Sequence, residues 1–324
     1  MNVFLTGATG YIGHELALAL ARNNIKVHAL IRDLKSKRIP IHNNIRVYQG
    51  DVCDYDSVLK AIEGCCYVIH SAAYTNLKYN GIANFYNTNV LGTENVLKAA
   101  LKQRVKKFIY TSTLSVYGPS FKEVPITEDQ PRMTTYANDY ELTTSMAEEL
   151  IVSYNKKGLP VTILNISRVY GPRLNHFSTA FRGLVKRVKY GNILFVPGKL
   201  NVQANYVYID DVIHAHLLSL KSNVGKKYII GGTNIDFWTL IAKIKSLSNG
   251  RLKIFRVNQF VFKMIFLLSN FYWQVLRGVS RIDYKQFKPF GFNQLSTSQK
   301  AKKDLNYNIT PIDEGLLKTI SLIK

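Results

Sequence analysis

The chain has few of the features of a disulfide-stabilised or zinc-binding protein. Its 324 residues include three cysteines, Cys53, Cys65 and Cys66, and none of them forms a C-x-x-C pair. This spacing excludes a disulfide framework or a common zinc site, and it fits a reducing compartment. We therefore expect a cytoplasmic protein with no metal site.

Long apolar runs are also missing. No run reaches the roughly 20 residues that cross a bilayer as a helix, and the longest, residues 260–273, contains Lys263. A strand-like segment begins at Asn2, so we expect no signal peptide. Within residues 260–276, apolar side chains recur on one helical face. A core or substrate-pocket helix is the expected role, and a helix lying in a membrane surface is the alternative. The recurring residues are Phe260, Met264, Leu267, Phe271 and Val275.

Acidic residues are scarce. The chain has 21 Asp and Glu against 43 Lys and Arg, which gives a net charge of +22. Such a surplus attracts nucleic acid, anionic lipid or phosphorylated substrates. No basic block accompanies a nucleic-acid fold signature, so we expect no nucleic-acid partner. The 47% of hydrophobic residues is enough for a large core.

Strand and helix signals alternate through residue 170. Repeated units of this kind predict an α/β, Rossmann-type doubly wound parallel sheet with a smaller C-terminal substrate lobe. Residues 1–170 are the expected sheet domain, and residues 205–232 are expected to return to it. Residues 171–204 and 233–324 are the expected lobe. The predicted strands are 2–5, 26–31, 45–48, 67–70, 107–111 and 161–166, and the predicted helices are 13–22, 55–63, 83–103 and 139–157.

Residues 6–13 read TGATGYIG between an apolar strand and a helix-forming segment. A glycine turn in this place exposes backbone N–H groups and the positive end of the helix dipole, which suits a phosphate. Because the context is strand, turn and helix, the motif predicts a dinucleotide site. Residues 1–170 are therefore the expected NAD(P)-binding Rossmann domain. Its residues are Gly7, Thr9, Gly10, Tyr11, Ile12 and Gly13.

The G-x-x-G-x-x-G spacing resembles the extended branch of the short-chain dehydrogenase/reductase superfamily. After the second strand the chain has Arg32, where an acidic residue would favour NAD. A guanidinium can bind a 2′-phosphate with two hydrogen bonds, so we expect NADP, with NAD as the alternative. Asp33 is a rival that could face the ribose instead.

Further residues at strand ends complete the expected cofactor site. Asp51 is placed to accept from the adenine amino group, with Val52 packing on the ring. The small residues Ala72 and Ala73 let the backbone approach the cofactor. The resemblance adds Thr111 and makes Ile166 the nicotinamide contact.

The resemblance also implies catalytic residues. The run from 110 to 118, YTSTLSVYG, matches the segment that carries the catalytic Ser or Thr, here Thr113. The run from 140 to 148, YELTTSMAE, matches Tyr-x-x-Ser-Lys-x-x-Ala-Glu, so Tyr140 is the catalytic tyrosine and Thr144 occupies the lysine position. A lysine there would lower the pKa of the phenol, and threonine supplies no charge. Tyr136 fits the pattern less well.

Three functions follow from this site. The first is an NADP-dependent oxidoreductase that transfers a hydride between nicotinamide and a carbonyl or hydroxyl carbon. The second is a nucleotide-sugar epimerase or dehydratase with tightly bound NAD(P). The third is a non-catalytic NADP-binding sensor.

The substrate is expected to be a small molecule, phosphorylated or nucleotide-linked. Arg168, Arg173 and Arg182 could hold a diphosphate. The resemblance implies a homodimer formed through helices like 83–103 and 139–157. His214 and His216 are two residues apart and lie on different faces of a helix, which argues against a metal pair.

Overall fold

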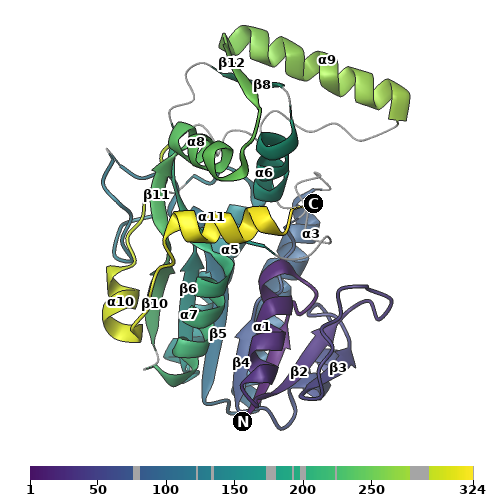
Figure 1. Ribbon diagram of the computed structural model, residues 1–324. Coiled ribbons are helices and arrows are strands. Elements are labelled where there is room, and N and C mark those ends of the chain that lie inside the picture. The colour runs from purple at the N-terminus through teal and green to yellow at the C-terminus, as the bar shows by residue number, and fades with distance from the viewer. Residues whose placement is uncertain are drawn as a thin grey trace.

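The computed structural model describes residues 1–75, 81–121, 123–132, 135–172, 180–191, 193–197, 202–222, 225–277 and 292–323. Figure 1 shows two parts of different size. A large sheet with helices on both faces contains most of the chain. A smaller lobe of helices and two short strands lies beyond one end of this sheet.

The large sheet has seven strands, and every neighbouring pair is parallel, as the apolar strand segments predict. Its order is β10-β6-β5-β4-β1-β2-β3, so the chain reverses direction across the sheet between β1 and β4. Ligands bind at such a reversal in doubly wound folds. The strands are β1 (Asn2–Thr6), β2 (Lys26–Ile31), β3 (Ile45–Gln49), β4 (Tyr67–His70), β5 (Lys107–Thr113), β6 (Val161–Ile166) and β10 (Lys226–Ile230).

Side chains alternate between the two faces of the sheet, as strand geometry requires. In β1, Val3 and Leu5 join the core under α1 (Tyr11–Arg22) and α7 (Ile209–Lys221), while Phe4 joins the core on the opposite face. That opposite face is covered by α2 (Tyr55–Ile62), α4 (Gly92–Lys102) and α5 (Asp139–Lys156). The sheet is therefore buried on both sides.

The predicted helix 83–103 is divided by a π-helical turn. It consists of α3 (Ile82–Phe85), the π turn η1 (Tyr86–Leu91) and α4. The π turn contains Asn89, which is almost fully buried. Single π turns inside helices often mark functional sites. A short 3-10 helix, η2 (Leu114–Tyr117), follows β5.

Residues 205–232 were expected to return to the large sheet, and they divide between two sheets. Strand β10 extends the large sheet beside β6. Strand β9 (Gln203–Tyr208) lies outside it and pairs with β7 (Arg168–Tyr170) and β11 (Thr233–Asp236). Helices α10 (Gln299–Leu305) and α11 (Ile312–Ser321) follow near the end of the chain.

The smaller lobe is built around a two-stranded parallel sheet of β8 (Ile193–Pro197) and β12 (Lys253–Val257). It also contains α6 (Ala180–Tyr190), α8 (Phe237–Ser248) and α9 (Gln259–Arg277). In Figure 1, α9 lies on the side of this lobe that is farthest from the large sheet. We refer to these five elements as the outer lobe.

The expectation of a core or pocket helix at residues 260–276 is wrong for its described side chains. Phe260, Met264, Leu267 and Phe271 are all exposed, by 42–71%. The apolar face of α9 therefore points away from the core. Among the described residues, no helix is long and apolar enough to cross a membrane.

Candidate active site

The turn between β1 and α1 leaves no room for side chains. Gly7 has a positive φ of 77°, and a Cβ on it would lie 2.6 Å from the backbone of Ser71. A Cβ on Gly13 would lie 2.1 Å from the Gly7 carbonyl oxygen. Gly10 donates its N–H to the same oxygen at 2.8 Å. The turn therefore requires glycine and presents backbone at the start of α1.

The first turn of α1 suits an anion. Its N-cap is Gly10, with no side-chain cap, and no acidic residue lies in the turn. Unpaired N–H groups at a helix start carry partial positive charge, which a phosphate can neutralise. The neighbouring Thr9, Tyr11 and Ile12 are half-buried here, and the Tyr11 hydroxyl donates to the Gly171 carbonyl at 3.3 Å.

A buried chain of hydrogen bonds joins β1 to β4. The Thr93 hydroxyl donates to the Asn89 carbonyl at 2.6 Å, so its oxygen accepts from His70 Nε2 at 2.9 Å. His70 Nδ1 then accepts from the Thr6 hydroxyl at 2.6 Å, and Thr6 accepts from the Ala72 N–H at 3.2 Å. The directions agree only if His70 is neutral with its proton on Nε2. Burial lowers the pKa of His70 to about 3, which keeps it neutral.

This chain fixes the backbone at the strand reversal. It places Ala72, which was predicted with Ala73 to lie near the cofactor, beside the glycine turn. It continues through Asn89, whose amide binds both backbone groups of Tyr74 and donates to the Thr143 hydroxyl of α5 at 3.0 Å. The glycine turn and helix α5 are therefore held by one network.

The predicted adenine end contains an ion pair. Arg32 Nη1 lies 3.7 Å from Asp51 Oδ2, and the Arg32 side chain is 74% exposed. Asp33, the rival for the ribose, accepts instead from the N–H of Lys35 at 2.8 Å. Arg32 thus projects into solvent beyond β2, while Asp33 stabilises its own turn.

Asp51 and Val52 lie directly after β3. One oxygen of Asp51 accepts from the Cys53 N–H at 3.0 Å. Val52 is buried against α4, so close that a Cβ on Gly92 would lie 2.7 Å from its side chain. The two residues are fixed in place by these neighbours.

Strands β5 and β6 bring Thr113 and Ile166 together, since these residues are direct partners in the sheet. Thr113 Oγ1 accepts from the Ser115 N–H at 3.2 Å, which leaves its own proton available for another acceptor. Thr111 behaves differently, because its hydroxyl is 2.9 Å from His216 Nε2 in α7. A cofactor contact by Thr111 stays a prediction.

Tyr140 and Thr144 are one turn apart at the start of α5. Burial raises the pKa of Tyr140, the Thr144 hydroxyl lowers it and Glu141 raises it, which leaves that pKa at about 12. No cation in the described part of the chain contributes to this balance. The Thr144 contact falls outside normal hydrogen-bond geometry, so Thr144 Oγ1 is buried without a partner among the described residues. Ser167 Oγ, just after β6, is in the same condition.

One charged group near this site was not identified from the sequence. Glu148, two turns beyond Tyr140 on α5, is 1% exposed and accepts from Ser112 and Asn165 at 2.5 and 2.6 Å. Burial alone would raise the pKa of Glu148, but Lys227 and Arg132 together hold that pKa below its ordinary value. An acidic residue on the buried side of a helix was the available signal.

Lys227 does not stand in for a cation beside Tyr140. Its ammonium lies 3.2 Å from Glu148 Oε2. Glu148 is eight residues from Tyr140, or about 12 Å along a helix. The Glu148 cluster therefore ties α5 to β10, and no described residue places a positive charge beside the phenol.

The predicted substrate arginines are divided. The Arg168 guanidinium lies 6.0 Å from the centre of the Tyr206 ring, Arg182 is half-buried on α6, and Arg173 lies outside the described residues.

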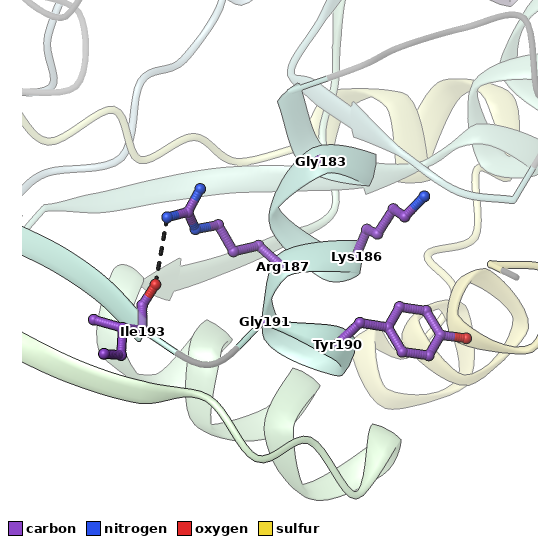
Figure 2. Close-up of a pocket in the computed structure, with 6 residues that line it drawn as sticks. All are labelled: Gly183, Lys186, Arg187, Tyr190, Gly191 and Ile193. Carbon is purple, nitrogen blue, oxygen red and sulfur yellow. Dashed lines mark hydrogen bonds between the residues drawn. The ribbon is translucent and has the colours of Figure 1, made fainter. Parts of the chain in front are cut away.

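The outer lobe has an open hollow of about 420 Å³. Figure 2 shows Arg187 donating to the Ile193 carbonyl at 3.3 Å across one side of it. It is lined by Gly183, Lys186, Arg187, Tyr190, Gly191 and Ile193.

Comparisons with known proteins place this chain in a family. Residues 3–231 match the model of the NAD dependent epimerase/dehydratase family. The chain is 30% identical to dTDP-D-glucose 4,6-dehydratase from Mus musculus, over 72% of this chain and 69% of that protein. It is 26% identical to short-chain dehydrogenase/reductase family 42E member 1 from Homo sapiens, over 96% of this chain and 85% of that protein.

A solved structure extends the likeness to the whole chain. UDP-glucose 4-epimerase from Thermotoga maritima, solved with UDP-glucose, superimposes with a TM-score of 0.81 at 22% identity, covering 99% of this chain and 98% of that one. At this identity the match shows the shared fold. Together with the family match, it shows that the chain belongs to the NAD dependent epimerase/dehydratase family, a family of enzymes within the extended short-chain dehydrogenase/reductase superfamily.

Proposed function

We propose that this protein is an NADP-dependent oxidoreductase that reduces a carbonyl group of a small molecule. The observation that carries this proposal is the continuity of the site along one edge of the sheet. The glycine turn at the start of α1 offers backbone N–H groups at one end. At the other end, Thr113 closes β5 and Ser167 follows β6, and helix α5, which carries Tyr140 and Thr144, packs on both strands.

The residues present fit a dinucleotide. Side chains are excluded at Gly7 and Gly13, where the backbone would approach a pyrophosphate. The buried, unpartnered Thr144 hydroxyl suits a ribose hydroxyl, because a buried polar atom without a partner destabilises the protein by about 1–3 kcal/mol. When bound, a nicotinamide cofactor supplies or accepts the hydride.

Thr113 and Tyr140 would handle the substrate oxygen. The Thr113 hydroxyl accepts from Ser115, so it can donate its proton to a carbonyl oxygen. With its pKa at about 12, Tyr140 is protonated at neutral pH and can give its proton to that oxygen as the carbonyl carbon gains a hydride. The phenolate left behind takes a proton from water. Reduction is the direction in which Tyr140 already has the required proton.

The replacement of the usual lysine by Thr144 is part of this proposal. A cation beside Tyr140 would stabilise its phenolate, and none is present among the described residues. Oxidation of an alcohol requires the phenolate as a base, so it should be slow at neutral pH. An enzyme with this site would reduce carbonyl compounds faster than it oxidises alcohols at neutral pH. A sensor that has lost its chemistry would do neither.

A preference for NADP would come from Arg32. Its guanidinium is exposed, and its 3.7 Å contact with Asp51 is long enough to be exchanged for a phosphate. Arg32→Ala should weaken NADPH binding by roughly 10- to 100-fold and leave NADH binding unchanged. Lys60→Ala removes another exposed charge as the matched control. Equal NADPH affinity in Arg32→Ala and Lys60→Ala would overturn the preference.

The experiment that tests the function is turnover of NADPH by the full-length protein against ketones, aldehydes and nucleotide sugars. We expect loss of nicotinamide absorbance with at least one carbonyl compound and none with Tyr140→Phe. Tight NADPH binding without turnover of any compound would favour the non-catalytic sensor.

A nucleotide-sugar epimerase or dehydratase is the second candidate. It is favoured by the likeness to a dTDP-D-glucose 4,6-dehydratase and by Arg168 and Arg182, cations that could hold a diphosphate. Such an enzyme converts its sugar without net change in cofactor. Product formation from dTDP-glucose or UDP-glucose, at constant nicotinamide absorbance, would support it over the reductase.

This proposal assigns cofactor binding and substrate binding to different parts of the chain. Residues 1–170 with β10 would bind the cofactor, and residues 171–204 and 233–324 would bind substrate. A homodimer through α4 and α5 belongs to the same proposal, and light scattering of the purified protein tests it.

A further inference from the structure

Helix α9 presents an apolar face to solvent. Its most exposed large side chains share one arc of about 140° on the helix, at 100° per residue. Phe262 and Phe266, on the opposite side, are less exposed. An amphipathic helix normally turns its apolar stripe toward the core. Here the stripe is outside, formed by Phe260, Met264, Leu267, Leu268, Phe271 and Tyr272, each 42–71% exposed.

Two further exposed aromatic side chains lie in the strands of the outer lobe. Phe195 in β8 and Phe255 in β12 are 43% and 46% exposed, and their ring centres lie 5.8 Å apart. Helix α9 packs on β8. We call α9 and these two phenylalanines the outer apolar face. Large exposed apolar side chains that gather on one surface mark an interaction site.

The charge around this face has a single sign. Residues 237–277, which include α8, β12 and α9, contain seven Lys or Arg and no Asp or Glu. Residues 180–197, which include α6 and β8, contain four Lys or Arg and no Asp or Glu. The outer lobe therefore combines apolar side chains with positive charge only, in a chain that has 21 acidic residues elsewhere.

This combination selects the partner. Lys243 of α8 pairs with Asp313 of α11, but the elements of the lobe supply no acidic residue of their own. A second copy of the same face would therefore bring two positively charged surfaces together, and they would repel. An anionic bilayer supplies both complements, because its acyl chains accept the apolar arc and its phosphates attract the lysines and arginines. No described helix can cross the membrane, so α9 would lie parallel to the surface.

We propose that the outer apolar face docks the protein on an anionic membrane surface, with α9 lying in the interface. Figure 1 shows α9 on the far side of the outer lobe from the large sheet, so the cofactor-binding sheet stays in water when α9 contacts lipid. The proposal does not depend on which reaction the active site performs.

The test is flotation of the full-length protein with vesicles of phosphatidylcholine, alone or mixed equally with phosphatidylglycerol. We expect the protein to float with the mixed vesicles at low ionic strength, to float less at high ionic strength and to float poorly with phosphatidylcholine alone. Absence of flotation with the mixed vesicles at low ionic strength would overturn the proposal. Equal flotation with both kinds of vesicle would also overturn it.

Variants distinguish binding through α9 from non-specific hydrophobic binding to vesicles. Replacing Phe260, Leu268 and Phe271 with Ser should reduce binding about tenfold or more. The matched control replaces Ile41, Phe121 and Val124 with Ser, which are 60–89% exposed elsewhere. It should bind as the unmodified protein does. Equal loss in both triples would overturn the proposal, and so would a change of oligomeric state in the α9 triple without any vesicle binding.

Charge reversal tests the electrostatic part. Lys253→Glu with Lys263→Glu, both in the outer lobe, should weaken binding to mixed vesicles about tenfold. Lys60→Glu with Lys102→Glu makes the same change of net charge on α2 and α4. Equal loss in the two pairs would show a response to net charge alone and contradict docking through α9. Unchanged thermal unfolding in each variant confirms that the fold is intact.

Discussion

The large sheet and the outer lobe use opposite arrangements of the same kinds of residue. In the sheet, polar groups such as His70 and Glu148 are buried and paired, and apolar side chains fill both faces. In the outer lobe, Phe260 and Phe271 face solvent, and positive charge has no acidic complement in residues 180–197 and 237–277. One region is organised around an internal site, and the other around its surface.

The contrast teaches how to interpret periodicity. An apolar stripe at helical spacing shows that a helix has two unlike faces, but it does not say which face meets the protein. For α1, the stripe meets the sheet. For α9, the stripe meets solvent. The feature of the sequence that accompanies this arrangement is the absence of acidic residues from residues 237–277.

The largest effect that would sharpen the comparison is expected at Tyr140. Tyr140→Phe removes the proton donor and should reduce turnover by roughly 10²- to 10⁴-fold, with cofactor affinity unchanged in a fluorescence titration. Tyr136→Phe is the matched control, since its hydroxyl binds the Ser145 hydroxyl at 2.8 Å instead. If Tyr136→Phe abolished turnover and Tyr140→Phe did not, the assignment of the catalytic tyrosine would be wrong.

The next effect tests the proton balance in the sheet region. Thr144→Lys places a cation beside Tyr140, which should lower its pKa from about 12 by roughly 1–3 units. Alcohol oxidation should then rise at neutral pH by about tenfold per unit, seen as a pH–rate profile displaced to lower pH. Thr144→Met introduces a side chain about as long as lysine but without its charge, so it should leave the pH–rate profile where it is. An unchanged profile in Thr144→Lys would mean that Tyr140 is not the base.

A smaller effect compares the same substitution in the two regions. Gly13→Ala puts a Cβ 2.1 Å from the Gly7 carbonyl oxygen, and overpacking of this kind costs about 1–3 kcal/mol, or roughly 10- to 100-fold in cofactor affinity. At Gly183 in α6 a Cβ meets no atom within 4 Å. Gly183→Ala should keep cofactor binding and raise stability by up to ~1 kcal/mol. Equal cofactor affinity in the two variants would contradict cofactor binding at the glycine turn.

The smallest effect, counted per pH unit, is the acid sensitivity of the sheet core. Burial lowers the pKa of His70 to about 3 and of His216 to about 4, from 6.5. The unfolded chain therefore binds more protons below pH 6.5, so stability falls as pH drops from 6.5 toward these values, by up to ~1.4 kcal/mol per pH unit for each histidine. His216→Asn should flatten the pH dependence of urea unfolding, and the exposed His214→Asn should not. The same slope in both variants would contradict this origin.

Much of the sheet could be predicted because its signals are local. Val3, Phe4 and Leu5 form a short apolar strand before glycines. The helices lie close to where the sequence predicts them, except that a π turn divides the helix predicted at 83–103. The glycine turn could be predicted because the contacts that require Gly10 and Gly13 lie within one segment, whereas the packing of Gly7 against Ser71 depends on the fold.

Other features depend on contacts that no local pattern contains. Thr111 meets His216 across 105 residues, and Glu148 meets Lys227 across 79. The pairing of β9 with β7 and β11 arises in the same way. Thr144 was identified from its place after Tyr140, but its lack of a partner appears only once the fold surrounds it.

The central claim is that the sheet region holds a nicotinamide dinucleotide at the glycine turn. Its most direct measurement is a fluorescence titration of the folded, full-length protein with NADPH and, separately, NADH. The account predicts saturable binding with NADPH the tighter ligand, weakened in Gly13→Ala by roughly 10- to 100-fold and retained in Gly183→Ala. Saturable binding of neither cofactor to the folded protein would contradict it.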